Sequence, residues 1–320
     1  MKIAIVRLSS LGDIVQSMYV LDLIKRNFND IEIDWYVDQN FEDIVYLSPC
    51  VKEVVGIPLR SLKKNKSIFG LIKLIFTLRK SKKSYDYVFD LQGLIKSAIV
   101  AKLINGKKVI GFSRKGLREK NAVFFYDKLV EIEYDVNVYI RYFELINSVF
   151  KIDLNPNINQ ITQYIFPRNK INRFSNKNIG VVMATSKLNK NYPPNLFYKA
   201  LKNTKFNLHL IWGNNYERLL ANNLKELIQN KKNIYILEKR DLIGLVDFIA
   251  TMDIIISSDT GILHLAPALG IKSIGLFGPT DPDRVFLQTP KNKYIKSPER
   301  EMKLIKPEQI SNLINELIIL

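Results

Sequence analysis

The chain is poor in the residues that build disulfide frameworks and metal centres. Its 320 residues include one cysteine, Cys50, and two histidines, His209 and His264. One cysteine excludes an internal disulfide framework and a cysteine-based metal cluster, and two histidines argue against a histidine-based zinc site. We expect Cys50 to be a small buried hydrophobic residue and His209, which lies inside a predicted strand, to be a core residue. We also predict that the protein has no bound metal and no cofactor.

Long apolar runs are also missing. No stretch approaches the ~18 uncharged apolar residues of a membrane-spanning helix, and the apolar run before Arg7 is too short for a secretory signal. Two nucleotide-binding signatures are absent as well, because the chain has no G-x-x-x-x-G-K-[ST] and its first predicted turn lacks G-x-G-x-x-G. We therefore expect a soluble cytoplasmic protein, and P-loop phosphoryl transfer and nicotinamide chemistry are disfavoured.

Positive charge, by contrast, is abundant, with 48 Lys and Arg against 31 Asp and Glu and a net charge of +17. Between Arg60 and Lys83 there are nine basic residues and no acidic one, and apolar residues lie among them from Ile68 to Leu78. This combination suits an anionic lipid surface or a phosphorylated acceptor, although a core helix with a solvated basic face is the alternative. The positive charge by itself would also allow binding to nucleic acid, but the sequence contains no nucleic-acid-binding motif that supports such a partner.

Short β-branched runs alternate with amphipathic stretches in both halves of the chain. The predicted strands are 2–7, 32–37, 53–57, 87–90, 108–112, 179–183, 207–212, 233–237, 254–257 and 273–277, and the predicted helices lie near 14–27, 41–47, 68–80, 94–104, 138–150, 262–269 and 307–318. This alternation predicts an α/β fold with parallel sheets covered on both faces.

The Asn- and Pro-rich segment 153–178 has the weakest regular pattern, so we place a linker there. The linker divides the chain into an N-terminal domain over 1–160 and a C-terminal domain over 161–303. The remaining residues, 304–320, contain a last helix that can reach back to pack on the first domain.

One turn near the C-terminus has the features of an anion site. A predicted buried strand ends at Ser257, the turn Asp259-Thr260-Gly261 follows, and an apolar helix begins at Ile262. The N–H groups of the first helical turn and the positive end of the helix dipole attract anions, and Gly261 allows a phosphate close to the backbone. The alternative is that Asp259 only caps the helix.

A second turn, Ser9-Ser10-Leu11-Gly12-Asp13, follows the first predicted strand and places a carboxylate at the mouth of the sheet. Two α/β domains of similar size usually share one cleft, so we expect each domain to contribute one of these turns to the site. The alternative is that Asp13 is the N-cap of a helix that begins at Ile14.

Together these turns resemble the bacterial lipopolysaccharide heptosyltransferases of glycosyltransferase family nine. The resemblance covers nearly the whole chain and rests on the turn Ser9–Asp13, on Asp259-Thr260-Gly261-x-x-His264 and on Phe277-Gly278-Pro279-Thr280-Asp281-Pro282. Other stretches are most similar to type I members of the family, which add the first heptose of the inner core. They are Asp90-x-Gln92-Gly93-Leu94-x-Lys96-Ser97-Ala98, Arg118-Glu119 with Phe125-Tyr126, and Ala184-Thr185-Ser186 with Lys190 and Tyr192-Pro193.

The resemblance implies a GT-B fold, in which two Rossmann-like domains with parallel sheets face each other across a cleft. It also implies ADP-L-glycero-D-manno-heptose (ADP-heptose) as donor, the first Kdo of Kdo–lipid A as acceptor, and an inverting single displacement without an obligatory metal. We accordingly expect a monomer associated peripherally with the cytoplasmic face of the inner membrane. The alternatives are a type II enzyme, a relative that uses another sugar nucleotide or acceptor, and a non-catalytic protein that binds anionic polymers.

The resemblance also assigns roles to individual residues. Asp13 matches the proposed general base, and Lys190 matches a lysine at the donor pyrophosphate. Glu217 matches a glutamate that binds the adenosine ribose, although an exposed helix glutamate is the alternative. The donor-binding residues are Thr185, Ser186, Glu217, Asp259, Thr260, Gly261 and His264. The acceptor-binding residues are Ser10, Gly12, Arg60, Lys63, Lys64 and Arg118. Asp281-Pro282-Asp283 has the D-x-D pattern of metal-dependent transferases, but we assign it to a turn.

Overall fold

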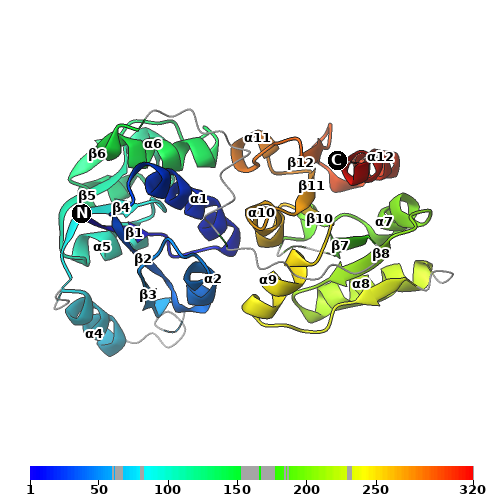
Figure 1. Cartoon of the computed structure of the whole chain (residues 1–320), viewed down its shortest axis with the longest axis horizontal. Helices are drawn as coiled ribbons and strands as arrows, with labels where there is room; N and C mark the ends of the chain where they lie inside the picture. Colours follow the sequence, from blue (N-terminus) through cyan, green and yellow to red (C-terminus); the bar gives the residue numbers. More distant parts are fainter. Residues whose placement is uncertain are drawn as a thin grey trace. The chain divides into compact units, whose positions relative to one another are not determined.

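Each half of the chain builds its own six-stranded parallel sheet covered by helices, as the computed structural model shows (Figure 1). The structure describes residues 1–59, 61, 68–79, 83–152, 166, 177–183, 185, 187–228 and 233–319. The chain divides into a first unit, Met1–Pro167, and a second unit, Arg168–Leu320. Apart from Phe166, Lys177 and Asn178, the linker that we predicted over 153–178 lies outside the described residues.

The sheet of the first unit has the strand order β3-β2-β1-β4-β5-β6. Its strands are β1 (Lys2–Val6), β2 (Glu32–Asp38), β3 (Glu53–Ile57), β4 (Tyr85–Asp90), β5 (Gly106–Phe112) and β6 (Lys128–Val130). Its described helices are α1 (Leu11–Asn27), α2 (Glu42–Tyr46), α4 (Ile68–Arg79), α5 (Ile95–Leu103) and α6 (Val138–Phe150). The central strand β1 is apolar on both faces, and Ile3 to Val6 are fully buried. They are buried because helices cover the sheet: α1 packs with α6, and α5 packs on the sheet as well.

The sheet of the second unit has the order β12-β11-β10-β7-β8-β9. Its strands are β7 (Asn178–Val182), β8 (Asn207–Ile211), β9 (Ile234–Ile236), β10 (Ile254–Ser258), β11 (Lys272–Phe277) and β12 (Asn292–Lys296). Its helices are α7 (Pro194–Leu201), α8 (Asn215–Leu227), α9 (Leu242–Ala250), α10 (Gly261–Ala268), α11 (Pro282–Val285) and α12 (Pro307–Ile319). Helices α7, α8 and α12 lie on one face of this sheet, and α9 and α10 lie on the other (Figure 1).

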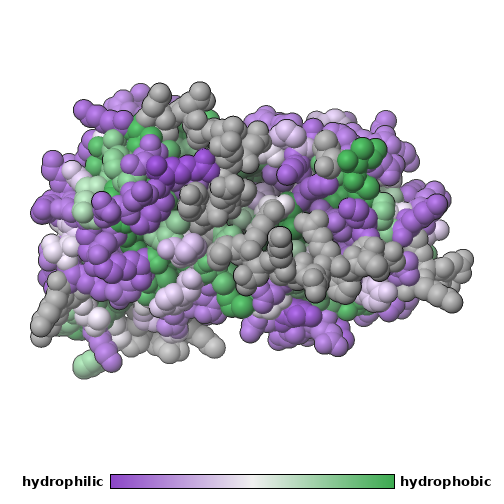
Figure 2. Space-filling view, viewed as in Figure 1, coloured by the Kyte–Doolittle hydropathy of each residue, from purple (hydrophilic) through white to green (hydrophobic). Residues whose placement is uncertain are grey.

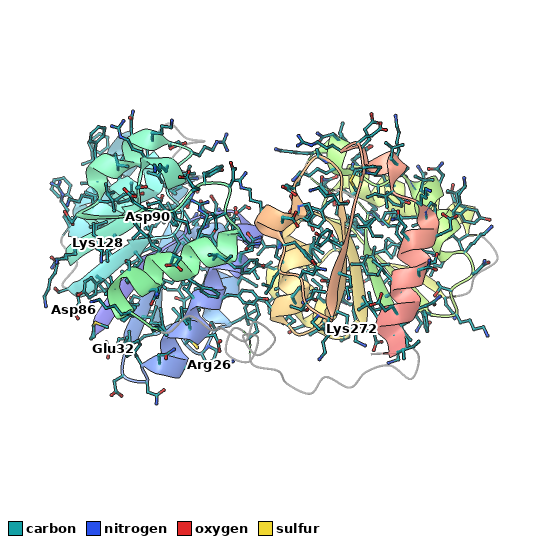
Figure 3. The ribbon with its side chains drawn as sticks, turned by 90° about the horizontal axis from the view of Figure 1, so that it is seen from above. Arg26, Glu32, Asp86, Asp90, Lys128 and Lys272 are labelled. Carbon is teal, nitrogen blue, oxygen red and sulfur yellow. The ribbon has the colours of Figure 1, made fainter. Side chains whose placement is uncertain are left out.

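The last helix, α12, packs on the second unit, to which it belongs. Its apolar stripe of Ile310, Ile314 and Leu317 is buried in the core of the second unit. The ammonium of Lys272 on β11 donates to the Leu317 carbonyl at 2.7 Å and holds the end of the helix (Figure 3).

The predicted strands are all present in the described residues, and two further strands, β6 and β12, complete the edges of the sheets. Both were missed because β6 has three residues and β12 contains an asparagine and two lysines among its five residues, so neither forms an apolar run. Hydrophilic side chains predominate on the face of the molecule in Figure 2. None of the helices in the described ranges is long and apolar enough to cross a membrane.

Candidate active site

In the first unit the strand order reverses between β1 and β4, and open α/β sheets bind ligands at the carboxyl edge of such a point. The turn from β1 to α1 lies there. Helix α1 begins at Leu11 with Ser10 as its N-cap, so the alternative that Asp13 caps a helix starting at Ile14 is wrong. Asp13 lies in the first helical turn, where its Oδ2 accepts from the backbone N–H of Ser10 at 2.9 Å and from its hydroxyl at 2.8 Å.

The other oxygen of the Asp13 carboxylate is held by a residue that we did not predict. Arg7 Nη2 lies 2.9 Å from Asp13 Oδ1, and Nη1 donates to the Leu91 carbonyl at 2.8 Å. Arg7 is buried, with its guanidinium 5.5 Å from the centroid of the Tyr142 ring, whereas the Asp13 side chain is 42% exposed. The only feature of the sequence that could have indicated this role of Arg7 is that a basic residue directly follows an apolar strand. The result is a fixed carboxylate that remains open to solvent.

The turn after β4 is tied to the same edge of the sheet. Gln92 Oε1 accepts from the backbone N–H of Leu8 at 2.8 Å, and the ammonium of Lys96 donates to the hydroxyl of Ser9 at 3.2 Å. Gly93 has a φ of +68°, which suits a residue without a side chain in this tight turn. These contacts hold the two turns together across the β1–β4 junction.

Asp90, which is labelled in Figure 3, lies at the end of β4 and organises the turn that follows this strand. Its Oδ1 accepts from the backbone N–H groups of Gln92 and Gly93 at 2.9 and 3.2 Å, and its Oδ2 accepts from the hydroxyls of Ser97 and Tyr126 at 2.9 and 2.7 Å. Burial raises the pKa of Asp90, although these hydrogen bonds oppose the rise. A fully buried carboxyl with four donors keeps the turn in one conformation.

The predicted acceptor-binding residues are only partly described. Ser10 is exposed and Gly12 is buried at the start of α1, while Arg118 is exposed beside Glu119, which accepts from the backbone N–H of Ile95 at 2.7 Å. The remaining three, Arg60, Lys63 and Lys64, lie outside the described residues.

In the second unit the strand order reverses between β7 and β10, and the predicted donor residues lie on both sides of that point. Lys190 follows β7, and its ammonium lies 2.5 Å from Oδ2 of Asp259, which follows β10. His264 Nε2 on α10 lies 3.3 Å from Oδ1 of the same carboxylate. The three side chains therefore form a cluster at the N-terminus of α10, with His264 buried and the other two half-buried.

The Asp259 carboxylate is ionised because of this cluster. Burial by itself would raise its pKa, but the hydrogen bonds and charges of His264 and Lys190 outweigh burial and hold the pKa well below its ordinary value. The alternative that Asp259 caps α10 is wrong, because Thr260 is the N-cap and its hydroxyl accepts from the backbone N–H of Leu263 at 3.4 Å.

The loop that carries Lys190 is folded by Thr185. The backbone N–H of Thr185 donates to Asn191 Oδ1 at 2.8 Å, and its hydroxyl donates to the Lys187 carbonyl at 2.8 Å and accepts from the Lys187 N–H at 3.1 Å. The hydroxyl hydrogen of Thr185 is thus engaged inside the loop, which ends in the short 3-10 helix η5 (Leu188–Lys190). The other hydroxyl that we predicted here, Ser186, lies outside the described residues.

Glu217 is buried at the start of α8, so the alternative of an exposed helix glutamate is wrong. Its Oε2 accepts from the backbone N–H of Gly213 at 2.6 Å, and its Oε1 accepts from the side-chain amide of Asn214 at 2.7 Å. Asn214 is in turn the N-cap of α8 and accepts from the backbone N–H of Glu217 at 3.0 Å. The carboxylate is held at the carboxyl edge of β8 and keeps lone pairs for further donors.

The two aspartates of the D-x-D pattern both contact β12, where the Lys296 ammonium lies near each of them. The Lys296 ammonium lies 2.8 Å from Asp281 Oδ1, and the Tyr294 hydroxyl donates to Asp283 Oδ1 at 2.9 Å. Within the described ranges, no three His, Cys, Asp or Glu side chains gather in a group that would hold a metal ion. Asp281 is the N-cap of the short helix α11 and Asp283 lies in its first turn, so the pattern marks a helix start rather than only a turn.

Two parallel α/β units of this topology are the components of the GT-B fold, which many glycosyltransferases have. A family model described as glycosyltransferase family 9 (heptosyltransferase) matches residues 72–313. The chain belongs to glycosyltransferase family 9.

The chain is also similar to individual heptosyltransferases. The chain is 36% identical over 314 residues to lipopolysaccharide heptosyltransferase 1 of Campylobacter coli, covering 92% of this chain and 89% of that protein. It is 27% identical to lipopolysaccharide heptosyltransferase 1 of Escherichia coli K12, covering 88% and 89%. The structure of the E. coli heptosyltransferase WaaC with ADP has a TM-score of 0.85 at 24% identity, covering 99% of this chain and 100% of that chain. The same enzyme with ADP-2-deoxy-2-fluoro heptose has a TM-score of 0.83 at 25% identity, covering 99% of each.

Proposed function

We propose that the protein transfers heptose from ADP-heptose to the first Kdo of Kdo–lipid A, the type I reaction of lipopolysaccharide inner-core synthesis. The observation that carries the proposal is the cluster of Lys190, Asp259 and His264 at the N-terminus of α10. It supplies a cation and helix-end amides for a diphosphate at the sheet edge where this fold class binds nucleotides. The ligands of the WaaC structures, ADP and ADP-2-deoxy-2-fluoro heptose, support the choice of donor, and the type 1 relatives support the choice of the type I reaction.

The donor diphosphate would meet the backbone N–H groups of Thr260 and Gly261 together with the Lys190 ammonium. In the described structure Lys190 is paired with Asp259, so a diphosphate would offer the ammonium a second anionic partner. His264 would continue to hold the Asp259 carboxylate, which is then placed to accept from a hydroxyl of the donor sugar. Glu217 would accept from the ribose hydroxyls, with Thr185 and Ser186 lining the phosphate side.

In the transfer step, the Kdo hydroxyl oxygen attacks the anomeric carbon of the heptose as its proton passes to the Asp13 carboxylate. The bond from that carbon to the ADP oxygen breaks with inversion, and its electron pair leaves on the diphosphate. An ordinary aspartate titrates near ~4, so it is a weak base at neutral pH. The proton therefore moves late, as the new C–O bond forms, and the helix-end amides and Lys190 stabilise the departing charge.

The acceptor would bind to residues of the first unit. Arg118, together with Arg60, Lys63 and Lys64, would meet the Kdo carboxylate and the lipid A phosphates, while Ser10 and Gly12 line the approach to Asp13. Because the acceptor is a lipid, we place the enzyme peripherally on the cytoplasmic face of the inner membrane, acting as a monomer.

The test is incubation of the purified chain with ADP-heptose and Kdo2–lipid A, followed by mass spectrometry of the lipid. Type I activity adds one heptose to an acceptor that has none. A type II enzyme, the activity named for a relative that is 25% identical, would leave this acceptor unchanged and extend a heptosylated one. A thermal-shift panel of ADP, UDP, GDP and CDP tests the nucleotide separately, and stabilisation by a nucleotide other than ADP would contradict the proposed donor.

A further inference from the structure

Helix α4 of the first unit exposes large apolar side chains along one face. Phe69 is 88% exposed, Ile72 45% and Phe76 57%. Spacings of three and four residues put these side chains on one stripe of the helix. Leu78 lies on the opposite side of the helix and is buried. The helix therefore packs on the first unit through that side, and the apolar stripe faces solvent.

A stripe of this kind differs from the scattered apolar residues of an ordinary surface, which need no explanation. Three bulky side chains on successive turns form a contiguous patch, and such patches mark contact sites. The helix lies at the periphery of the first unit (Figure 1), and Lys73 and Arg79 are exposed along it.

The sequence in and around α4 is strongly basic, which favours an anionic partner. The stretch from Arg60 to Lys83 has nine Lys and Arg residues and no Asp or Glu. Each cation that lies near an anionic membrane surface strengthens the attraction to that surface. Apolar insertion together with basic residues is the pattern of helices that lie in the interface of a bilayer.

We propose that α4 is a membrane-docking helix that lies in the interface of an anionic phospholipid bilayer. Phe69, Ile72 and Phe76 enter the boundary between headgroups and acyl chains, and Lys73 and Arg79 contact the lipid phosphates. The inference deepens the proposed function, on which it rests for the lipid acceptor, because docking through α4 brings the first unit to the surface that holds Kdo–lipid A.

The test is binding of the full chain to vesicles of phosphatidylethanolamine and phosphatidylglycerol, measured by co-sedimentation, with phosphatidylcholine vesicles for comparison. The variant Phe69→Ser/Ile72→Ser removes apolar surface and no charge. Its matched control is Leu219→Ser/Leu227→Ser on α8, whose leucines are 56% and 47% exposed. We expect the α4 variant to bind anionic vesicles at least about tenfold more weakly, the control to bind like the wild type, and phosphatidylcholine vesicles to bind little of any form.

Unchanged binding of the α4 variant would overturn the proposal, as would failure of the wild type to bind anionic vesicles. A self-association of the wild type that the α4 variant abolishes in sedimentation velocity would assign the stripe to a second copy and would overturn it too. Heptosyl transfer gives an independent readout. We expect the α4 variant to have a raised KM for Kdo2–lipid A in vesicles and an unchanged rate with detergent-dispersed acceptor. Vesicle binding without any transfer would reject the proposed function and leave the docking helix standing.

Discussion

Arg7 and Asp13 form a 2.9 Å ion pair across the turn from β1 to α1, with the guanidinium buried and the carboxylate open to solvent. Burial alone would lower the pKa of Arg7, but the neighbouring Tyr142, Asp13 and Asp90 raise it, so the guanidinium keeps its charge. Because Arg7 also donates to the Leu91 carbonyl, its position is fixed by the sheet. It therefore acts as a positioning residue for the proposed base.

Replacing Arg7 should change the pH dependence of transfer. Arg7→Met removes the counter-charge of Asp13, so we expect kcat to fall by about 10- to 100-fold and the acidic limb of the kcat/KM profile to move to higher pH. KM for ADP-heptose should stay unchanged. Arg7→Lys keeps the charge but cannot bind Asp13 and Leu91 together, so it should recover part of the loss. Superimposable pH profiles for wild type and Arg7→Met would mean that Arg7 has a purely structural role.

Asp13→Asn keeps the shape of the side chain and removes its ability to take a proton. We expect kcat to fall by at least ~10²-fold, with the affinity for ADP-heptose nearly unchanged. Single-turnover kinetics together with calorimetric titration of ADP separate the two effects. Turnover within a few-fold of the wild type would rule out Asp13 as the base and would favour a binding protein or a different base.

Lys190→Ala removes the cation proposed to meet the diphosphate. We expect both a lower kcat and weaker ADP binding, because the charge would act on the bound and on the departing diphosphate. Lys190→Arg should retain more of the binding than Lys190→Ala, since it keeps the charge. ADP titration and steady-state kinetics check both expectations, and unchanged values for the alanine variant would remove Lys190 from the site.

Asp259 should also make stability depend on pH. Its pKa in the folded protein lies below the ordinary value, so its contribution to the free energy of unfolding is fully present above pH ~4 and is lost as the pH falls through the folded pKa. Asp259→Asn should lower the thermal midpoint by several degrees at neutral pH. The difference should shrink as the pH falls below ~4, because the carboxyl is then protonated in the unfolded chain while it stays ionised in the folded protein, so unfolding takes up a proton. Calorimetry at pH 7, 5 and 3 measures it, and a difference that is the same at all three values would contradict the pairing.

Much of the fold could be predicted from the sequence because it depends on neighbours along the chain. Strands such as β1 and β10 are continuous apolar runs, which are typical of buried parallel strands. The turn at Asp259 and the helix after it follow from local preferences in the same way, since a Thr–Gly pair suits a helix start. The exact start of α1 was missed, because Ser10 and Asp13 are both good capping residues and the choice between them depends on packing.

The contacts at the site were decided by the tertiary structure. Lys190 and Asp259 are 69 positions apart, and Leu8 and Gln92 are 84 apart, so no local pattern relates them. They meet because the strand order places β7 beside β10 and β1 beside β4. Three further features also depend on which surface each element covers. They are the burial of Arg7, the packing of α12 on the second unit and the exposure of Phe69. The sequence determined the elements and the chemistry of their turns, and long-range packing of the sheets determined which of those groups act together.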